Sequence, residues 1–233
     1  MGEDAHTVTP RPALVSVLLP SRGRPGSLIE AGYSLLETAS DPYDVEIIVG
    51  YDADDPATLN AAKAFKSDTL LFPTRHGYDQ LHLYMNELAK WASGRWLLLW
   101  NDDATMTTHS WDSIIGQFDH TTPLVLSPSS TGYGHGLCCF PAASRALYDT
   151  LGHLSFSPHV DTWLQDLGRA TGTIRDIPVH VPHDRADLTG GHQDQTRAES
   201  LAGYRTDAFY GDEMQALLHA DIERIRSWPE SGG

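Results

Sequence analysis

The segment Arg95-Trp96-Leu97-Leu98-Leu99-Trp100-Asn101-Asp102-Asp103 joins an apolar run to an amide and two carboxylates. Similar apolar runs lie at 15–19, 46–50, 69–72 and 124–126. Each run is apolar at successive positions, which is typical of strands covered by helices on both faces of a mostly parallel sheet. These runs therefore predict the strands of one buried sheet.

Segments with helical periodicity separate these runs, at 25–39 after Pro25, at 57–66 after Asp55-Pro56, and at 81–92. Strands that alternate with helices predict an α/β fold with an open, mostly parallel, Rossmann-like sheet flanked by helices. After about Pro128 we expect a flexible loop at 129–136, helices at 142–151 and 160–171, and a short strand at 177–181. A mobile polar loop at 184–196 and an amphipathic helix at 207–228 complete the prediction.

This pattern divides the chain into a flexible N-terminal arm (1–12), an α/β domain (13–198) and a C-terminal helical extension (199–233). Within the domain we expect two halves, at about 13–104 and at about 105–198. The C-terminal helix offers a surface through which the protein could form oligomers. The length of 233 residues suits one domain, or one domain with a small appendage.

Composition excludes several classes of protein. The two cysteines, Cys138 and Cys139, are adjacent and cannot join distant segments, so a disulfide scaffold is excluded. The sequence contains no apolar run long enough to span a membrane and no signal-peptide pattern, so we expect a cytoplasmic protein. The formal charge of −15 disfavours nucleic acid as a partner, although a local basic groove can coexist with an acidic total.

Polar groups follow each of the first four predicted strands, at 20–24, 51–55, 74–77 and 101–103. Ligands of parallel sheets bind beyond the carboxyl ends of the strands, so these groups should converge at one edge. Arginines there suit a diphosphate, and the carboxylates suit a divalent cation that bridges the diphosphate to the protein. The alternatives are ordinary turn chemistry at 52–55 and a helix cap at 101–103.

These segments resemble a known family. Val17-Leu18-Leu19-Pro20-Ser21-Arg22-Gly23-Arg24 is similar to the first strand and loop of family 2 inverting glycosyltransferases with the GT-A fold, and 46–52 resembles their second strand. Asn86, Ala92 and Gly94 keep the spacing of the family's Asn-x-Gly-x-x-x-Ala-x-Gly helix, with Leu88 at the first glycine position. Residues 99–103 resemble the strand that ends in the Asp-x-Asp motif. The resemblance covers about residues 14–166.

The resemblance implies a site for a nucleoside-diphosphate sugar and a divalent metal, Mn2+ or Mg2+. It also implies that the half at about 13–104 binds the nucleotide and that the half at about 105–198 binds the acceptor. Asn101 stands where the first aspartate of the motif would be, which leaves Asp103 as the better metal ligand. His183 is the expected second ligand, and the alternatives are His180 or no histidine at all; an imidazole ligand favours manganese somewhat. The donor-binding residues expected on this basis are Pro20, Ser21, Arg22, Arg24, Asp52, Arg75, Asn101 and Asp102.

Segments 136–140, Arg145 and 151–152 resemble the acceptor side of the family. Asp161 lies where these enzymes carry the catalytic base, with Asp166 as the second choice and a capping or surface aspartate as the alternative. Tyr133, in a glycine-flanked loop, is the expected acceptor contact.

The predicted function is metal-dependent, inverting transfer of a sugar from a nucleoside-diphosphate sugar to an acceptor hydroxyl. A sugar-nucleotide pyrophosphorylase and a non-catalytic nucleotide-sugar-binding module remain alternatives. The acceptor is left open among polysaccharide, lipid-linked sugar, protein and a hydroxylated nucleobase in DNA. The last of these would need base flipping and a basic groove.

Overall fold

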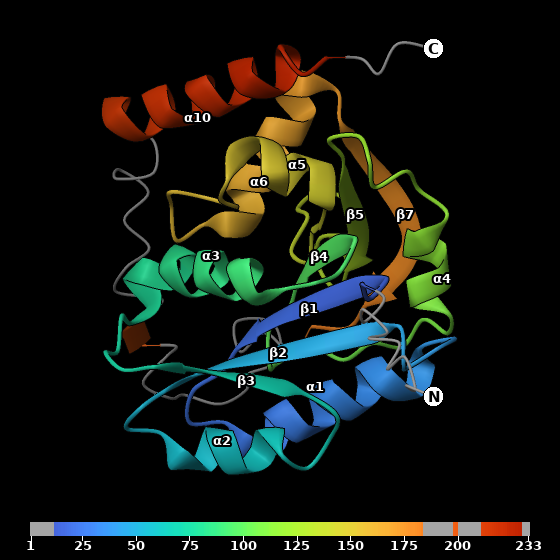
Figure 1. Ribbon diagram of the computed structural model, residues 1–233, viewed down its shortest axis with the longest axis vertical. Helices are drawn as coiled ribbons and strands as arrows, with labels where there is room; N and C mark the ends of the chain where they lie inside the picture. The colour runs from blue at the N-terminus through green and yellow to red at the C-terminus, as the bar shows by residue number, and fades with distance from the viewer. Residues whose placement is uncertain (1–11, 184–197, 200–210, 230–233) are drawn as a thin grey trace, which may run out of the picture.

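The computed structural model describes residues 12–183, 198–199 and 211–229 (Figure 1). Its centre is a seven-stranded sheet with the order β3-β2-β1-β4-β6-β5-β7. The strands are β1 (Val15–Pro20), β2 (Val45–Asp52), β3 (Asp68–Phe72), β4 (Trp96–Leu99), β5 (Val125–Ser130), β6 (Ala142–Ser144) and β7 (Ile174–Val181). The mixed α/β architecture with one central sheet confirms the predicted fold class.

The sheet is mostly parallel, as predicted. Strand β1 pairs in parallel with β2 and β4, β2 with β3, and β5 with β7. Strand β6 runs antiparallel to both of its neighbours, β4 and β5. Because the first four strands in sheet order are all parallel, their carboxyl ends meet along one edge, where the predicted polar groups lie.

Helices cover both faces of the sheet (Figure 1). They are α1 (Pro25–Thr38), α2 (Pro56–Ala62), α3 (Leu81–Trp91), α4 (Trp111–Gly116), α5 (Arg145–Leu151), α6 (Val160–Thr171) and α10 (Asp212–Arg226). Successive residues of β1 belong to opposite cores. Val17 is part of the cluster that contains residues of α1, α2 and α4, and Leu18 is part of the cluster that contains residues of α3, α5, α6 and α10. Burial on both faces explains why the strand sequences are apolar throughout.

Local sequence signals set the helix boundaries. Prolines occupy the first turns of α1 and α2, where a missing N–H costs nothing. The side chain of Asp55 caps α2 by accepting from Thr58 N. Helices α5 and α6 end at Gly152 and Gly172, both in the left-handed conformation that glycine adopts without strain.

Three details differ from the sequence prediction. The short helix α4 was not predicted, and the predicted helix at 142–151 is strand β6 followed by α5. Ser144 ends the strand and caps the helix, since its hydroxyl accepts from Leu147 N at 3.1 Å. The predicted loop at 129–136 begins two residues later, because Ser129 and Ser130 extend β5.

The family-like helix positions have structural roles. Asn86 accepts from Leu154 N at 2.8 Å and donates to Ser155 O at 2.8 Å, which ties α3 to the segment before α6. A Cβ atom on Gly94 would lie 2.5 Å from Ser16 N, so only glycine fits between α3 and β4. The positions of Asn86 and Gly94 in the motif are therefore explained by contacts within the fold.

Helix α10 confirms the described part of the predicted C-terminal helix, and it lies across α5 and α6 (Figure 1). Its buried Asp221 accepts from Trp163 Nε1 at 3.1 Å and lies 2.8 Å from His153 Nε2. The predicted arm at 1–12, apart from Pro12, and the predicted loop at 184–196 lie outside the described residues. Within the described part of the chain, no helix has the length and apolar character needed to cross a bilayer.

Candidate active site at the carboxyl edge of the sheet

The loop after β1 and the end of β4 are joined by a buried carboxylate. Asp102 Oδ2 accepts from Ser21 Oγ at 2.6 Å, and Asp102 Oδ1 accepts from Arg24 at 3.1 Å. The side chain is only 8% exposed, and this burial raises the pKa of Asp102 to about 6 despite the opposing guanidinium. Both oxygens of Asp102 are therefore occupied in holding the β1 loop.

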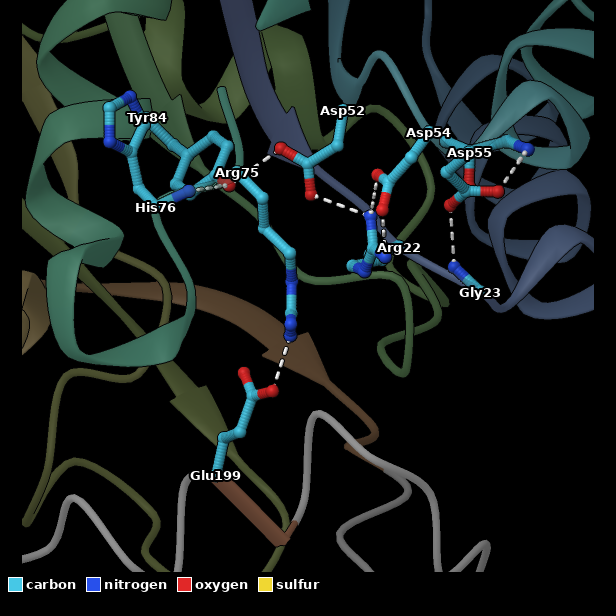
Figure 2. Close-up of polar contacts among 10 residues, drawn as sticks. Arg22, Gly23, Asp52, Asp54, Asp55, Arg75, His76, Tyr84 and Glu199 are labelled. Carbon is cyan, nitrogen blue, oxygen red and sulfur yellow. Dashed lines mark hydrogen bonds and ion pairs between the residues drawn. The ribbon is translucent and has the colours of Figure 1, made fainter. Parts of the chain in front are cut away.

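A second carboxylate, Asp52, lies at the end of β2 (Figure 2). It accepts from Tyr84 Oη at 2.6 Å and from Arg22 at 3.0 Å, and it is 3% exposed. Burial, together with the hydrogen bond to Asp52, raises the pKa of Tyr84 to about 12. The phenol therefore stays protonated and donates to the carboxylate.

Neighbouring aspartates hold the same loop. Asp54 forms a two-pronged ion pair with Arg22, at 2.5 and 2.8 Å. Asp55 accepts from Gly23 N at 2.8 Å, where Gly23 takes a φ of +68° that favours glycine. The loop after β1 is thus held at each residue from Ser21 to Arg24 by carboxylates that end or follow β2 and β4. Figure 2 shows the contacts of Arg22 and Gly23.

Another carboxylate of this edge, Asp103, contacts a histidine from the segment after β7. The segment after β7 returns to the end of β4, since Ala104 and His183 form an antiparallel bridge and Thr105 N donates to Pro182 O at 3.0 Å. This brings His183 Nε2 to 3.1 Å from Asp103 Oδ1. Burial lowers the pKa of His183, but Asp103 and Cys139 outweigh it and raise the pKa to about 9.

The pair formed by Asp103 and His183 fits a divalent cation. Two ligands at right angles on a metal with bonds of about 2.1 Å lie roughly 3 Å apart, which is close to the 3.1 Å observed. The described residues contain no group of three or more His, Cys, Asp or Glu side chains that could hold a metal. The remaining coordination positions would therefore fall to ligand oxygens and water, as is usual for Mg2+ beside phosphates.

Arg75 follows β3 and reaches across the edge (Figure 2). Its guanidinium forms an ion pair with Glu199, 124 positions later in the chain. Arg75 Nε is buried and has no hydrogen-bond partner among the described residues. This arginine therefore lies at the edge with part of its donor capacity unused.

Two predicted residues, Asp161 and Asp166, lie on α6. Asp161 lies in the first turn of α6 and accepts from Thr162 N at 2.7 Å, and burial raises the pKa of its carboxyl. Among the described residues, no hydrogen bond or ion pair joins Asp161 to Asp103. Burial also raises the pKa of Asp166, further along α6.

Four more predicted positions have the following surroundings. The ring of His180 lies 3.0 Å from Ser129 Oγ on β5, and no hydrogen bond or ion pair joins it to Asp103 among the described residues. Tyr133 is 37% exposed in the turns after β5. Asn101 and Pro20 are partly buried at the ends of β4 and β1.

Sequence reasoning did not assign a role to Tyr84, Asp54, Asp55 or Glu199. Tyr84 is a buried position of α3, and its spacing indicates only the apolar stripe of a helix. Asp54 and Asp55 lie in the acidic run 52–55, whose sequence is compatible both with an ordinary turn and with ligand binding. No local signal marks Glu199, because its partner is distant in sequence.

A cavity of about 490 Å3 lies beside α3 and is lined by residues that include Phe72, His76, Asn86 and His153. The rings of Phe72 and His76 pack against Tyr84, with centroids 4.5 and 5.2 Å away. None of the edge carboxylates lines this cavity. It is therefore separate from the cluster at the carboxyl edge.

Comparisons with known proteins agree with this geometry. The family model "Glycosyl transferase family 2" matches residues 16–210. No curated protein matches the chain at a significant level.

Several solved structures share the fold. The mannosyltransferase PcManGT from Pyrobaculum calidifontis, in complex with GDP-Man and Mn2+, is 14% identical with a TM-score of 0.58, over 94% of this chain and 83% of that one. Glucosyl-3-phosphoglycerate synthase from Mycobacterium tuberculosis, with Mn2+, UDP and glucosyl-3-phosphoglycerate, is 17% identical with a TM-score of 0.55, over 82% and 80%. TarS 1–349 from S. aureus, in complex with UDP, is 13% identical with a TM-score of 0.55, over 87% and 74%. At these identities the likeness concerns the fold.

Proposed function

Since the chain belongs to glycosyl transferase family 2 and is a glycosyltransferase, we propose that it transfers a sugar from a nucleoside-diphosphate sugar to an acceptor hydroxyl, with inversion and with a divalent cation. The observation that carries this proposal is the pair formed by Asp103 and His183 at the edge where Asp52 and three arginines also gather. Nucleotides or nucleotide sugars, in two cases with Mn2+, accompany the structural neighbours named above, which supports the same ligand class.

The donor would lie along the edge from β4 to β3. Three strand spacings of about 4.8 Å place these two strands roughly 14 Å apart, so one group of the ligand cannot meet both. The diphosphate would face Asp103 and Arg24 at β4, and the nucleobase would face Asp52 and Arg75 at β2 and β3. Ser21, Arg22, Pro20, Asn101 and Asp102 would line or shape the path between them.

Asp103 and His183 would hold Mn2+ or Mg2+. When bound, such a cation supplies positive charge that stabilises the departing nucleoside diphosphate. Arg24 lies 3.8 Å from Asp103 Oδ2, so its guanidinium adds charge at the same end of the donor.

Asp161 would serve as the base. Its carboxylate would take the proton of the acceptor hydroxyl while the acceptor oxygen bonds to the anomeric carbon. The bond from that carbon to the diphosphate oxygen would break on the opposite face, and the electron pair would leave with the nucleoside diphosphate. This sequence inverts the anomeric centre. Tyr133 would contact the acceptor.

The test is turnover of UDP, GDP and CDP sugars with Mn2+ or Mg2+, with release of the nucleoside diphosphate as the readout. Asp103→Ala and added chelator should each reduce release by roughly 100-fold or more. The control is Asp119→Ala, which removes an exposed carboxylate whose only hydrogen-bond partner among the described residues is Thr121. Full activity in Asp103→Ala would contradict the metal site.

The products also separate the alternatives. Formation or consumption of inorganic pyrophosphate would indicate a sugar-nucleotide pyrophosphorylase. Binding of the nucleotide without release from any sugar, across a broad set of acceptors, would indicate a binding module.

A further inference from the structure

Glu199 is the one described partner of Arg75 that comes from beyond β7, and its contact crosses the nucleobase end of the proposed donor site. We propose that Glu199 is a positioning residue for the glycosyl transfer: it holds the Arg75 guanidinium across this end of the site, where the remaining N–H groups of Arg75 bind the donor's nucleobase. This inference rests on the proposed function and adds a residue from the C-terminal part of the chain to it.

The main chain of Arg75 is fixed first. His76 N donates to Tyr84 Oη at 2.9 Å, and Tyr84 donates to Asp52. The loop after β3 is therefore held to the same carboxylate that ends β2 (Figure 2). The backbone position of Arg75 is therefore fixed by the contacts of its neighbour His76, through Tyr84, to Asp52.

Glu199 fixes the other end of the side chain. Its carboxylate pairs with Arg75 Nη2, and it also lies against the loop, since a Cβ atom added to Gly77 would be 3.7 Å from Glu199 Oε2. The Arg75 and Glu199 side chains are 28% and 27% exposed, so the pair is partly desolvated. A guanidinium held at both ends loses less entropy when it binds a ligand.

The ion pair between Arg75 and Glu199 leaves other N–H groups of the guanidinium to bind a ligand. Glu199 engages only Nη2, and Arg75 Nε is buried without an acceptor among the described residues. Because the Arg75 side chain is still 28% exposed, an acceptor atom of the ligand can approach it and form a charge-assisted hydrogen bond. Arg75 also contributes, after Arg22, to the lowered pKa of Asp54, which agrees with a guanidinium facing the end of β2.

The chemistry of the partner follows from these groups. Arg75 donates hydrogen bonds, whereas the nearby Asp52 and Asp54 accept them. Together they suit a base that carries a ring N–H beside a carbonyl oxygen, as uracil and guanine do. A base without that pair, such as adenine, would match this arrangement less well.

The experiment compares Glu199→Gln with Glu223→Gln. Glu223 also pairs with an arginine, Arg226, at 2.9 Å on the exposed side of α10, so the control removes the same charge from the same kind of pair. Calorimetry with Mn2+ measures the binding of UDP, GDP and inorganic pyrophosphate to each variant and to the wild type. Donor turnover gives KM and kcat, and thermal unfolding checks the fold.

In Glu199→Gln we expect UDP or GDP to bind about fivefold more weakly, because the ion pair that holds the Arg75 guanidinium becomes a weaker hydrogen bond to an uncharged amide. Donor KM should rise by a similar factor while kcat changes little. Pyrophosphate binding and Tm should match those of Glu223→Gln, since pyrophosphate reaches only the β4 end. Arg75→Met should weaken nucleotide binding further, and adding Glu199→Gln to it should cause no additional loss.

Other outcomes overturn the inference. Unchanged nucleotide affinity in Glu199→Gln would remove the positioning role, and tighter binding would make Glu199 a competitor of the donor. Both results leave the proposed function intact, provided that the wild type still releases nucleoside diphosphate. A wild type that binds no nucleotide and transfers no sugar would overturn both proposals.

Discussion

Ser21 Oγ donates a hydrogen bond of 2.6 Å to Asp102 Oδ2, although 81 positions separate the two residues in the chain. The bond joins the loop after β1 to the end of β4, which are neighbouring parallel strands. It therefore fixes the relative position of the two segments between which the proposed donor would pass.

We predict that Ser21→Ala destabilises the fold by about 1–3 kcal/mol, because it leaves a buried carboxylate without one of its donors. Urea unfolding at pH 7 measures this change. The control is Ser227→Ala, which removes an exposed hydroxyl that bonds Arg224 O at 3.0 Å. Equal stability of the two variants would contradict a structural role for the bond.

Tyr84→Phe should weaken nucleotide binding by roughly tenfold with little effect on kcat. The substitution removes the donor to Asp52 and the acceptor of His76 N while keeping the ring packing. Calorimetry with UDP and GDP is the measurement. Tyr33→Phe is the matched control, because the Tyr33 hydroxyl bonds Ala64 O at 2.6 Å on the exposed side of α1. If both variants bind UDP and GDP as tightly as the wild type does, the hydrogen bond from Tyr84 to Asp52 does not contribute to nucleotide binding.

Asp161→Asn should reduce sugar transfer by roughly 100-fold or more, because an amide cannot take the acceptor proton. Burial raises the pKa of Asp161, so the base becomes protonated at a higher pH than an ordinary aspartate. The acid limb of kcat/KM should therefore lie above pH 3.9, and activity should fall as the pH drops through it. Asp166→Asn is the control, and a larger loss there would assign the base to Asp166 instead.

Asp112→Asn should destabilise the protein at neutral pH by about 1–3 kcal/mol. Asp112 is buried, which by itself raises its pKa, but hydrogen bonds from Ser40 N, Ser40 Oγ and Asp41 N outweigh this and lower the pKa. The carboxylate therefore adds stability above its unfolded pKa of about 3.9, and this stability is lost as the pH falls through the lower folded value.

Urea midpoints measured between pH 7 and pH 3 test this expectation. The gap between the wild type and Asp112→Asn should narrow toward acid. Asp149→Asn, on the exposed side of α5, should follow the wild type throughout. A gap that stays constant with pH would rule out the carboxylate charge as the source of the stability.

The sheet could be predicted from sequence because its strands are buried on both faces, which produces unbroken apolar runs such as 96–99. Strand β6 could not, because Ala142 and Ala143 have no strand preference and Ser144 begins a helix. Its place between β4 and β5 depends on contacts that are distant in sequence.

The edge cluster was predictable for a related reason. Parallel strands bring their carboxyl ends together, so Asp52 and Asp103 fall on one edge once the strands are known. The partners of these residues were not predictable. Tyr84 comes from a helix face and Glu199 from beyond β7, and neither position carries a local pattern that specifies its contact.

The antiparallel bridge between Ala104 and His183 has a consequence for the order in which the chain can fold. His183 follows β7, the last strand among the described residues, yet it pairs with Ala104 just beyond the end of β4. If Asp103 and His183 chelate manganese as proposed, a truncated chain that stops before β7 would lack the ion's second anchor. Manganese would then stabilise only chains that include β7 and His183. The increase in Tm on adding Mn2+ would therefore distinguish the full-length chain from the truncated one.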